Sequence, residues 1–290
     1  MLKNRQNDIE NMSYIRTALL LGLLTGVLLA IGWLWQGITG MTIFLGIALI
    51  INFLAYWFSD KIVLAMYRAK PVQKSEEPKL HSIVEKISKE MGIPKPKVYL
   101  VNLPILNAFA TGRNYSHAAI AVTSGLLKQL NSEEIEGVVS HELSHVKNRD
   151  TLTSAVAATV AGAIAYIAQI AWYGMFMGGD RRRGGSLLFL PLILLAPVAA
   201  TLIQLAISRT RELAADRTGA IISKKPLELA SALEKISKVA KQYPLNGNAA
   251  TSHLFIVNPF KGDALLSLFS THPSVEIRVQ KLKELAKELK

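Results

Sequence analysis

Cysteine is absent from the 290 residues of this sequence, and this absence limits the chemistry available to the chain. Without cysteine there is no disulfide framework and no thiolate metal site. Any metal ion must therefore bind histidine, aspartate or glutamate. Charged residues are also few, at 19%, whereas 50% of the residues are hydrophobic and the mean hydropathy is +0.28. That average is too apolar for an ordinary soluble enzyme and is typical of a protein that is part membrane and part globular.

The net charge of +12 suggests nucleic-acid binding as one function. The lysines, however, are spread through amphipathic segments and lack the interleaved aromatic residues of a single-strand binder. Basic residues also gather beside membrane spans on the cytoplasmic side, and this explains the charge better. We therefore expect a lipid bilayer as a partner and no nucleic acid.

Four stretches carry no charged residue and are long enough to cross the hydrocarbon core as helices, which takes about 20 residues. They are residues 17–35, 41–58, 151–177 and 187–207. The first is interpreted as a retained anchor and not a cleaved signal peptide, because its apolar stretch is longer than a signal core and sixteen residues precede it. The sequence thus predicts a multi-pass protein of the cell membrane.

Basic residues on both sides of the first two spans place the N-terminus and the chain after residue 58 in the cytoplasm. They are Lys3, Arg5, Arg16, Lys61, Arg68 and Lys70. Residues 181–183, all arginine, lie in the turn between the third and fourth segments and would be outside after four full crossings. Either the rule is broken there or these two segments form a hairpin that does not fully cross. We expect four spans.

The spans divide the chain into four regions, and the fold class they predict is mainly α-helical with a small β-sheet. The regions are an N-terminal transmembrane hairpin (1–58), a first globular part (59–150), a second transmembrane hairpin (151–207) and a second globular part (208–290). In the first globular part, helical spacing of apolar residues predicts a helix over 79–92 that ends at Gly92. Short strands are predicted over 97–103 and 118–125.

The stretch VVSHELSHVKNRD, residues 138–150, places two histidines four residues apart beside a glutamate. Asn131, three residues before Glu134, predicts a capping-box start of a helix that contains this stretch. Its apolar residues fall on one stripe: Ile135, Val138, Val139, Leu143 and Val146. On such a helix His141 and His145 present imidazole nitrogens to one point, and Glu142 flanks that point.

Two imidazoles from one turn are half of a tetrahedral zinc site, and a third protein ligand leaves one position open for water. The candidate ligand is Glu212, on a second predicted helix, where it would otherwise be an ordinary charged residue at the end of a span. Asp216, one turn further on, can accept the free N–H of a ligating histidine or merely pair with an arginine. With zinc to lower the pKa of water from about 15.7 to about 7, Glu142 can act as general base in peptide hydrolysis.

The motifs HELSH at 141–145 and RELAAD at 211–216, beside membrane spans, resemble those of the HtpX family of membrane zinc metalloproteases, relatives of the prenyl-protein (CAAX) endoproteases. The likeness includes LNAFATG at 106–112 and THPS at 271–274. It implies a cytoplasmic zincin-like protease domain that binds one zinc ion per chain. The ligands it implies are His141, His145 and Glu212, with Glu142 as catalytic base. It also implies a stress-related role in the quality control of misfolded or damaged membrane proteins.

The other site residues are less sharply defined by the sequence. Given the resemblance, His272 either steadies the oxyanion or has a structural role before Ser274, which can cap a terminal helix. Residues 107–122 end in a strand directly before the zinc helix, and proteases of this kind hold substrate as an added strand along such an edge. Asn107, Ala108 and Phe109 are therefore candidate substrate-binding residues, although Asn107 can also simply serve a turn.

Two other functions compete with a quality-control endopeptidase. One is a CAAX-type prenyl-protein endoprotease, but such enzymes carry additional spans around a large chamber. The other is a non-catalytic, metal-stabilised membrane scaffold. A structural zinc site closes all four positions with protein ligands, and no fourth ligand beyond His272 is apparent. Catalysis is therefore favoured, with polypeptides as substrates, and the oligomeric state is not indicated.

Overall fold

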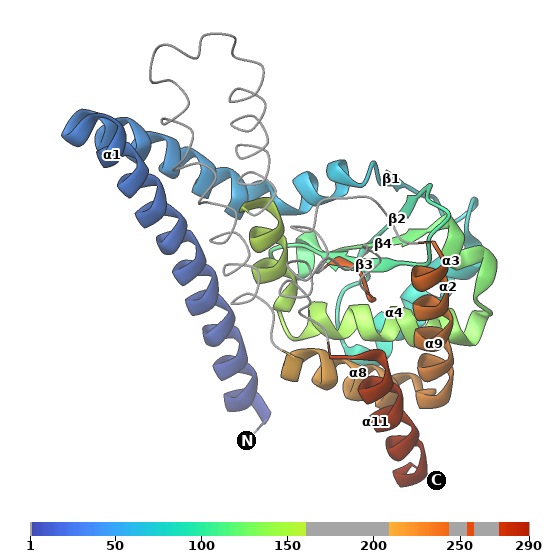
Figure 1. Cartoon of the computed structure of the whole chain (residues 1–290). Helices are drawn as coiled ribbons and strands as arrows, with labels where there is room; N and C mark the ends of the chain where they lie inside the picture. Colours follow the sequence, from blue (N-terminus) through green and yellow to red (C-terminus); the bar gives the residue numbers. More distant parts are fainter. Residues whose placement is uncertain (1, 161–208, 244–253, 258–272, 290) are drawn as a thin grey trace.

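The computed structural model describes residues 2–160, 209–243, 254–257 and 273–289. Within these ranges the protein is mainly helical with a small four-stranded sheet, as the sequence predicts. Figure 1 shows one long apolar helix beside a globular part in which the sheet and the shorter helices pack together.

The long helix α1, Leu2–Met66, changes direction at Gln36 and Gly37, where the backbone is not helical. Gly37 has a φ of 57°, which glycine adopts without strain. The predicted spans 17–35 and 41–58 fall on the two arms that meet at this bend, and the second arm runs on past residue 58 to Met66. Next to the bend, a Cβ added at Gly32 would lie 2.5 Å from the carbonyl oxygen of Gly40, so the arms approach closely there.

Among the described residues one helix, Tyr14–Met66, is long and apolar enough to cross a membrane. Large apolar side chains are exposed along both arms, including Leu19, Leu34 and Ile50 at 66%, 72% and 62% exposure. A helix whose exposed sides are this apolar is suited to lipid contact. Of the third and fourth predicted spans, residues 151–160 are helical, and residues 161–207 lie outside the described residues.

The sheet has the strand order β1-β2-β4-β3. The strands are β1 (Lys70–Pro71), β2 (Lys97–Val101), β3 (Ala108–Thr111) and β4 (Ala119–Thr123). β2 and β4, which correspond to the two predicted strands, pair in parallel, and β3 pairs antiparallel with β4. β4 therefore lies inside the sheet, and among the described strands β3 forms the edge on its side, opposite the edge formed by β1.

The strand β3 was not predicted, because the sequence AFAT has neither β-branched enrichment nor alternating polarity. The chain leaves β3 through Gly112, whose φ is 130°. A Cβ at that position would lie 2.4 Å from the carbonyl oxygen of His117, so glycine is required for the turn. A short 3-10 helix, η1 (Tyr115–His117), then leads into β4.

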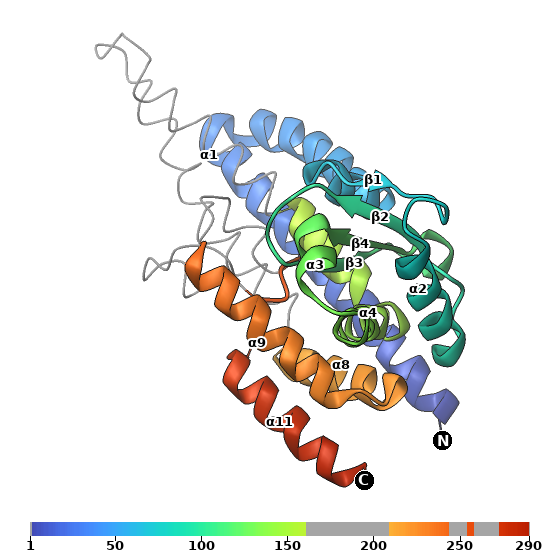
Figure 2. The same ribbon diagram turned by 90° about the vertical axis from the view of Figure 1, so that its right-hand side faces the viewer.

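The helix α4, Ser132–Lys147, lies at the centre of the globular part. It has β3 on one side and α8 and α9 on the other, and α2 packs beside it (Figures 1 and 2). The surrounding helices are α2 (Pro78–Met91), α3 (Ser124–Gln129), α8 (Arg209–Ser223), α9 (Pro226–Gln242) and α11 (Val275–Glu288). The predicted stripe of α4 is buried in the main core cluster.

The predicted signals at the ends of three helices are confirmed. The side chain of Asn131 accepts hydrogen bonds at the start of α4, and the side chain of Glu134 accepts one from the backbone N–H of Asn131, which completes a capping box. Gly92 ends α2 in a left-handed conformation, and Ser274 caps α11 by accepting from the backbone N–H of Ile277. Each signal depends on residues within one turn of each other, which is why the sequence alone reveals it.

Candidate metal centre

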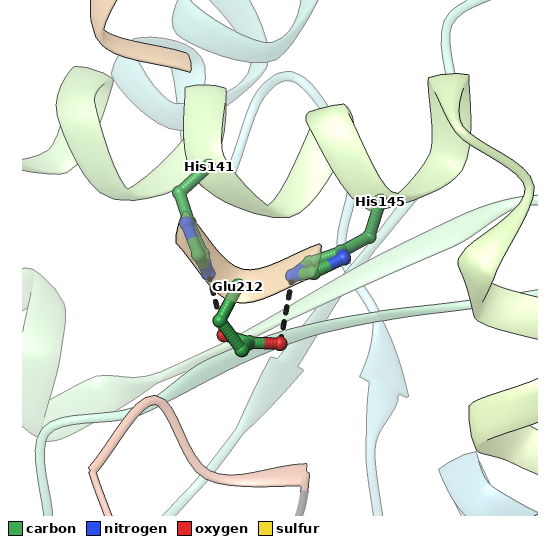
Figure 3. Close-up of side chains that lie close together, drawn as sticks. All are labelled: His141, His145 and Glu212. Carbon is green, nitrogen blue, oxygen red and sulfur yellow. Dashed lines mark ion pairs between the residues drawn. The ribbon is translucent and has the colours of Figure 1, made fainter. Parts of the chain in front are cut away.

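Three predicted ligands lie together at the heart of the globular part. His141 and His145 project from adjacent turns of α4 toward Glu212 of α8 (Figure 3), and one ligand atom from each of the three lies within 4.8 Å of the other two. Nε2 of His141 is 3.6 Å from Oε2 of Glu212, and Nε2 of His145 is 3.4 Å from Oε1 of Glu212. Two ligands bound tetrahedrally at about 2.1 Å would be about 3.4 Å apart. The spacing of these three side chains therefore fits one metal ion.

A glycine allows the two ligand-bearing helices to approach. A Cβ added at Gly219 of α8 would lie 2.8 Å from the backbone nitrogen of His141 and 3.0 Å from its Cα. These are backbone atoms, which cannot turn aside as a flexible side chain can. Gly219 is two turns from Glu212 on the same helix, so the close contact there brings the carboxylate up to the histidines.

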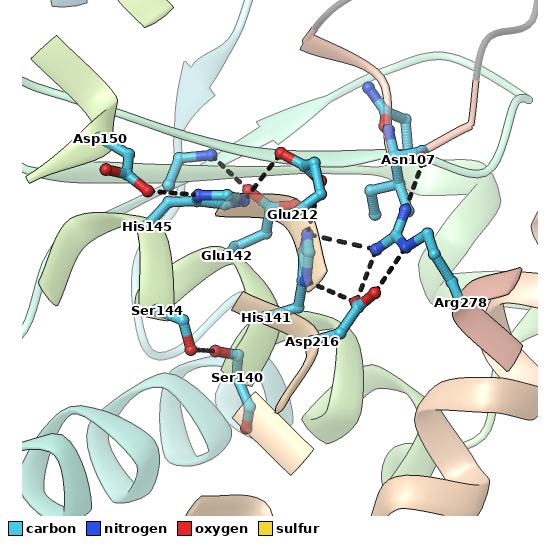
Figure 4. A network of polar contacts seen from close by, with 12 residues as sticks. Asn107, Ser140, His141, Glu142, Ser144, His145, Asp150, Glu212, Asp216 and Arg278 are labelled. Carbon is cyan, nitrogen blue, oxygen red and sulfur yellow. Dashed lines mark hydrogen bonds and ion pairs between the residues drawn. The ribbon is translucent and has the colours of Figure 1, made fainter. Parts of the chain in front are cut away.

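The Nδ1 atom of each imidazole contacts a carboxylate of its own, from Asp216 for His141 and from Asp150 for His145 (Figure 4). Nδ1 of His141 is 2.9 Å from Oδ1 of Asp216, and Nδ1 of His145 is 3.3 Å from Oδ2 of Asp150. Asp150 in turn forms an ion pair with Arg211. Carboxylates placed in this way fix the orientation and tautomer of a metal-binding histidine. Asp216 thus lies against His141 as the sequence suggested, whereas the partner of His145 was missed even though it ends the motif.

The most important residue missed is Arg278 of α11, whose side chain is completely buried. It makes two hydrogen bonds of 2.7 Å to the carboxylate of Asp216, and its Nη2 is 3.4 Å from Nε2 of His141. Burial alone would raise the pKa of Asp216, but the guanidinium of Arg278 and the ring of His141 hold it well below its ordinary value. A signal was present in the sequence, since Arg278 falls on the apolar stripe of α11 with Val275, Leu282 and Leu285.

Glu142 is buried beside the two histidines, at 6% exposure. Its Oε2 accepts a hydrogen bond of 2.9 Å from the backbone N–H of Ala110 in β3. Burial raises the pKa of this carboxyl, and the neighbouring histidines only partly oppose the shift. A carboxyl with a raised pKa is better matched to taking up and releasing a proton near neutral pH.

The free edge of β3 borders the same cavity. The carbonyl of Asn107 accepts from Thr123 of β4, so by the alternation of an antiparallel strand the backbone groups of Ala108 and Ala110 point toward the free edge. The hydrogen bond from Ala110 to Glu142 follows this direction. A cavity of about 50 Å³ lies between β3, α4 and Glu212.

Asn107 and Phe109, the other predicted substrate residues, contact other parts of the chain, and Asn107 contacts the segment 254–256. The side-chain amide of Asn107 donates to the carbonyl of Leu254 and accepts from the backbone N–H of Ile256. The ring of Phe109 packs 5.1 Å from that of Tyr67, measured between centroids. Arg278 also reaches this segment, because its Nη1 donates to the carbonyl of Ile256. His272 lies outside the described residues.

Two histidines one turn apart, a carboxylate from a second helix, and a buried glutamate beside them define a metal-dependent hydrolase site of the HExxH type. Residues 74–286 match Peptidase family M48, and the chain belongs to this family. It is 53% identical over 280 residues to "Protease HtpX homolog" of Pyrococcus furiosus, a match that covers 95% of this chain and 97% of the relative. The identity to "Protease HtpX homolog" of Aquifex aeolicus is 47% over 290 residues, covering 97% and 94%.

Among solved structures, the protein is similar to the crystal structure of S. mikatae Ste24p. The TM-score is 0.46 at 16% identity, and the match covers 95% of this chain and 66% of the other.

The sequence comparisons confirm the predicted resemblance to the HtpX proteases. The protein is a membrane-bound metalloendopeptidase that acts on polypeptides and uses a metal cofactor. The alternative of a non-catalytic scaffold is therefore not supported.

Proposed function

We propose that the protein is a zinc-dependent endopeptidase in which His141, His145 and Glu212 hold one zinc ion. The observation that carries this proposal is the convergence of two imidazole nitrogens and one carboxylate at 3.4 Å and 3.6 Å. Nitrogen and oxygen donors in a tetrahedral arrangement suit zinc, and three protein ligands leave the open position of a catalytic site. When bound, the metal supplies an acidic water at neutral pH and polarises the peptide carbonyl.

In this proposal Glu142 is the general base. Its Oε2 is held by the backbone N–H of Ala110, which leaves Oε1 to accept the proton of the attacking water. The same carboxyl then delivers that proton to the nitrogen of the departing amine, which completes hydrolysis of the peptide bond. Asp216 and Asp150 keep the two imidazoles in the tautomer that directs Nε2 toward Glu212.

The free edge of β3 is the proposed substrate-binding site, with Ala108 and Phe109 on the strand and Asn107 just before it. An extended substrate can add as a strand to the outward-pointing backbone groups of Ala108 and to the carbonyl of Ala110. Such pairing recognises backbone and not side chains, so broad sequence specificity follows. This supports clearance of misfolded or damaged membrane proteins as the physiological role. For His272 we keep the two roles inferred from the sequence, either steadying the oxyanion or a structural one.

The decisive experiment replaces Glu142 by Gln in the full-length protein purified in detergent. Casein cleavage should fall by at least about 10²-fold, while elemental analysis still finds one zinc ion per chain. Glu133→Gln is the matched control, since Glu133 lies on the same helix but is 62% exposed at its side chain. Unchanged cleavage by the Glu142→Gln protein would remove this residue from the mechanism. Another metal in the wild-type protein would overturn the assignment of zinc.

The proposal extends to topology: four spans, with residues 59–150 and 208–290 forming the protease domain on the cytoplasmic face. It is supported by the four uncharged segments and by the basic residues that flank the first two. A reporter tag inserted in the turn at 178–186 tests it. An external location is expected, and a cytoplasmic one would mean that the third and fourth segments do not cross fully.

A further inference from the structure

A second cavity, of about 270 Å³, lies where the end of α1 meets the loop that follows β3. None of its lining residues is part of the metal centre. They are three aromatic residues of α1, two charged residues that follow them, and two residues of the loop: Phe53, Trp57, Phe58, Asp60, Lys61, Arg113 and His117. We refer to this cavity as the α1–loop pocket.

The sequence places the α1–loop pocket at the edge of the hydrocarbon core. The uncharged run of residues 41–58 ends with Trp57 and Phe58, and Asp60 and Lys61 are the first charged residues after it. Trp57 and Phe58 are 45% and 36% exposed in the described structure. Aromatic residues in this position, followed directly by charge, lie at the level of the lipid headgroups.

Arg113 is held in the α1–loop pocket by contacts with Trp57 and His117. Its Nη1 donates to the backbone carbonyl of Trp57 at 2.9 Å, and its guanidinium carbon lies 4.7 Å from the centroid of the Trp57 ring. Its Nη2 is 3.0 Å from Nε2 of His117, whose Nδ1 is 2.7 Å from Oδ1 of Asn114. An amide oxygen only accepts and a guanidinium only donates, so Nδ1 of His117 donates to Asn114 and Nε2 accepts from Arg113.

The charges of the α1–loop pocket leave a cationic excess. A guanidinium has five N–H donors, and the two contacts above use two of them, which leaves three for a ligand. Lys61 lies with Nζ 5.3 Å from the ring centroid of Phe58, and within the described ranges neither cation forms an ion pair. Two cations and Asp60 give a net charge of about +1. By contrast, in the groove between α9 and α11 lysines pair with glutamates, as Lys283 does with Glu234 at 3.0 Å.

We propose that the α1–loop pocket binds the headgroup phosphate of an anionic phospholipid. Arg113 and Lys61 would donate to the phosphate oxygens, and the exposed rings of Trp57 and Phe53 would contact the first part of the acyl chains. A phosphodiester carries one negative charge, which balances the excess of the pocket. Arg113 comes two residues after β3, so a lipid bound here fixes the free edge of that strand at the membrane surface.

The test uses the full-length protein in detergent, titrated with a short-chain phosphatidylglycerol and followed by native mass spectrometry. Lys61→Gln and Arg113→Gln should each weaken lipid binding about fivefold, the contribution of one basic residue near an anionic membrane surface. Arg113→Lys keeps the charge and should fold if loss of charge disturbs the loop. Lys89→Gln and Lys128→Gln each remove one charge from an exposed site elsewhere and should each leave binding unchanged.

Two further titrations decide between sources of the phosphate group. Phosphatidylcholine of the same chain length should bind at least about fivefold more weakly than phosphatidylglycerol, and inorganic phosphate should not compete at millimolar concentration. Equal binding of the two lipids, or unchanged binding in the Lys61→Gln protein, would overturn the proposal. Displacement of the lipid by millimolar phosphate would also overturn it, because the ligand would then be a free anion.

Discussion

Replacement of Arg278 by Met tests how the buried ion pair behind the metal centre acts. Asp216 is 3% exposed and receives two hydrogen bonds of 2.7 Å from Arg278, so the variant leaves a buried carboxylate without its cation. Breaking a buried pair on one side costs about 3–5 kcal/mol of unfolding free energy. One kcal/mol corresponds to about 2–4 °C for a domain of 150–250 residues, so the melting temperature should fall by roughly 10 °C.

The metal centre should weaken at the same time. Asp216 contacts Nδ1 of His141, and without Arg278 the pKa of Asp216 rises, because only His141 then opposes the effect of burial. A protonated Asp216 no longer fixes the imidazole, and the loss of such a contact lowers metal affinity by about 10–100-fold. Zinc affinity is measured by competition with a chromophoric chelator on the purified protein.

A double variant separates loss of charge from loss of packing. Asp216→Asn combined with Arg278→Met removes both charges, so it should be more stable than Arg278→Met alone. Arg217→Met is the control, because Arg217 lies on α8 with 61% of its side chain exposed and a 3.5 Å contact to Glu288. A surface pair of this kind contributes about 0–1 kcal/mol. The reasoning is refuted if the single losses simply add in the double variant, or if Arg278→Met is no less stable than Arg217→Met.

Two further predictions concern the approach of the helices and the effect of pH. Gly219→Ala places a Cβ 2.8 Å from the backbone of His141, so it should cost about 1–3 kcal/mol of unfolding free energy and weaken zinc binding. Gly46→Ala, with nothing within 4 Å, should do neither; equal effects in the two melting curves would contradict this. In the metal-free protein, burial lowers the pKa of His145, but the carboxylates of Glu212 and Asp150 have the larger effect and raise this pKa to about 9. Zinc binds only the neutral ring of His145. The zinc affinity measured by chelator competition should therefore rise about tenfold per pH unit up to about pH 9. An affinity that is constant from pH 7 upward would refute the raised pKa of His145.

The raised pKa also sets the pH dependence of stability in the metal-free protein. Because the folded value lies above the ordinary value of about 6.5, the proton on His145 stabilises the fold fully below pH 6.5. That contribution is lost as the pH rises to about 9. The metal-free His145→Gln protein should lack this slope in its melting temperature.

The parts of the site that the sequence predicted are those encoded at helical spacing. His141 and His145 meet because four residues span one turn, and Asp216 falls beside His141 because it is one turn from Glu212. The capping box of Asn131 and Glu134 fixed the register of the helix that carries the histidines. Such relations survive in any environment that permits a helix, so the sequence alone suffices.

The parts that were missed depend on contacts between distant segments. Arg278 reaches Asp216 across 62 positions and His141 across 137, and nothing local determines that α11 packs against α8. β3 is a strand because it pairs with β4 and not because AFAT favours one. Asp150 was overlooked because it lies beyond the end of α4, where the helical spacing that located the histidines no longer applies.

The separation of Glu212 from the two histidines has a consequence for biogenesis. A long apolar stretch lies between them in the chain, so the ribosome completes His141 and His145 well before the carboxylate that joins them. A nascent chain thus lacks the full set of donors until the intervening stretch has been synthesised and the second globular part has docked. The donor set of the metal centre is therefore completed only late in synthesis.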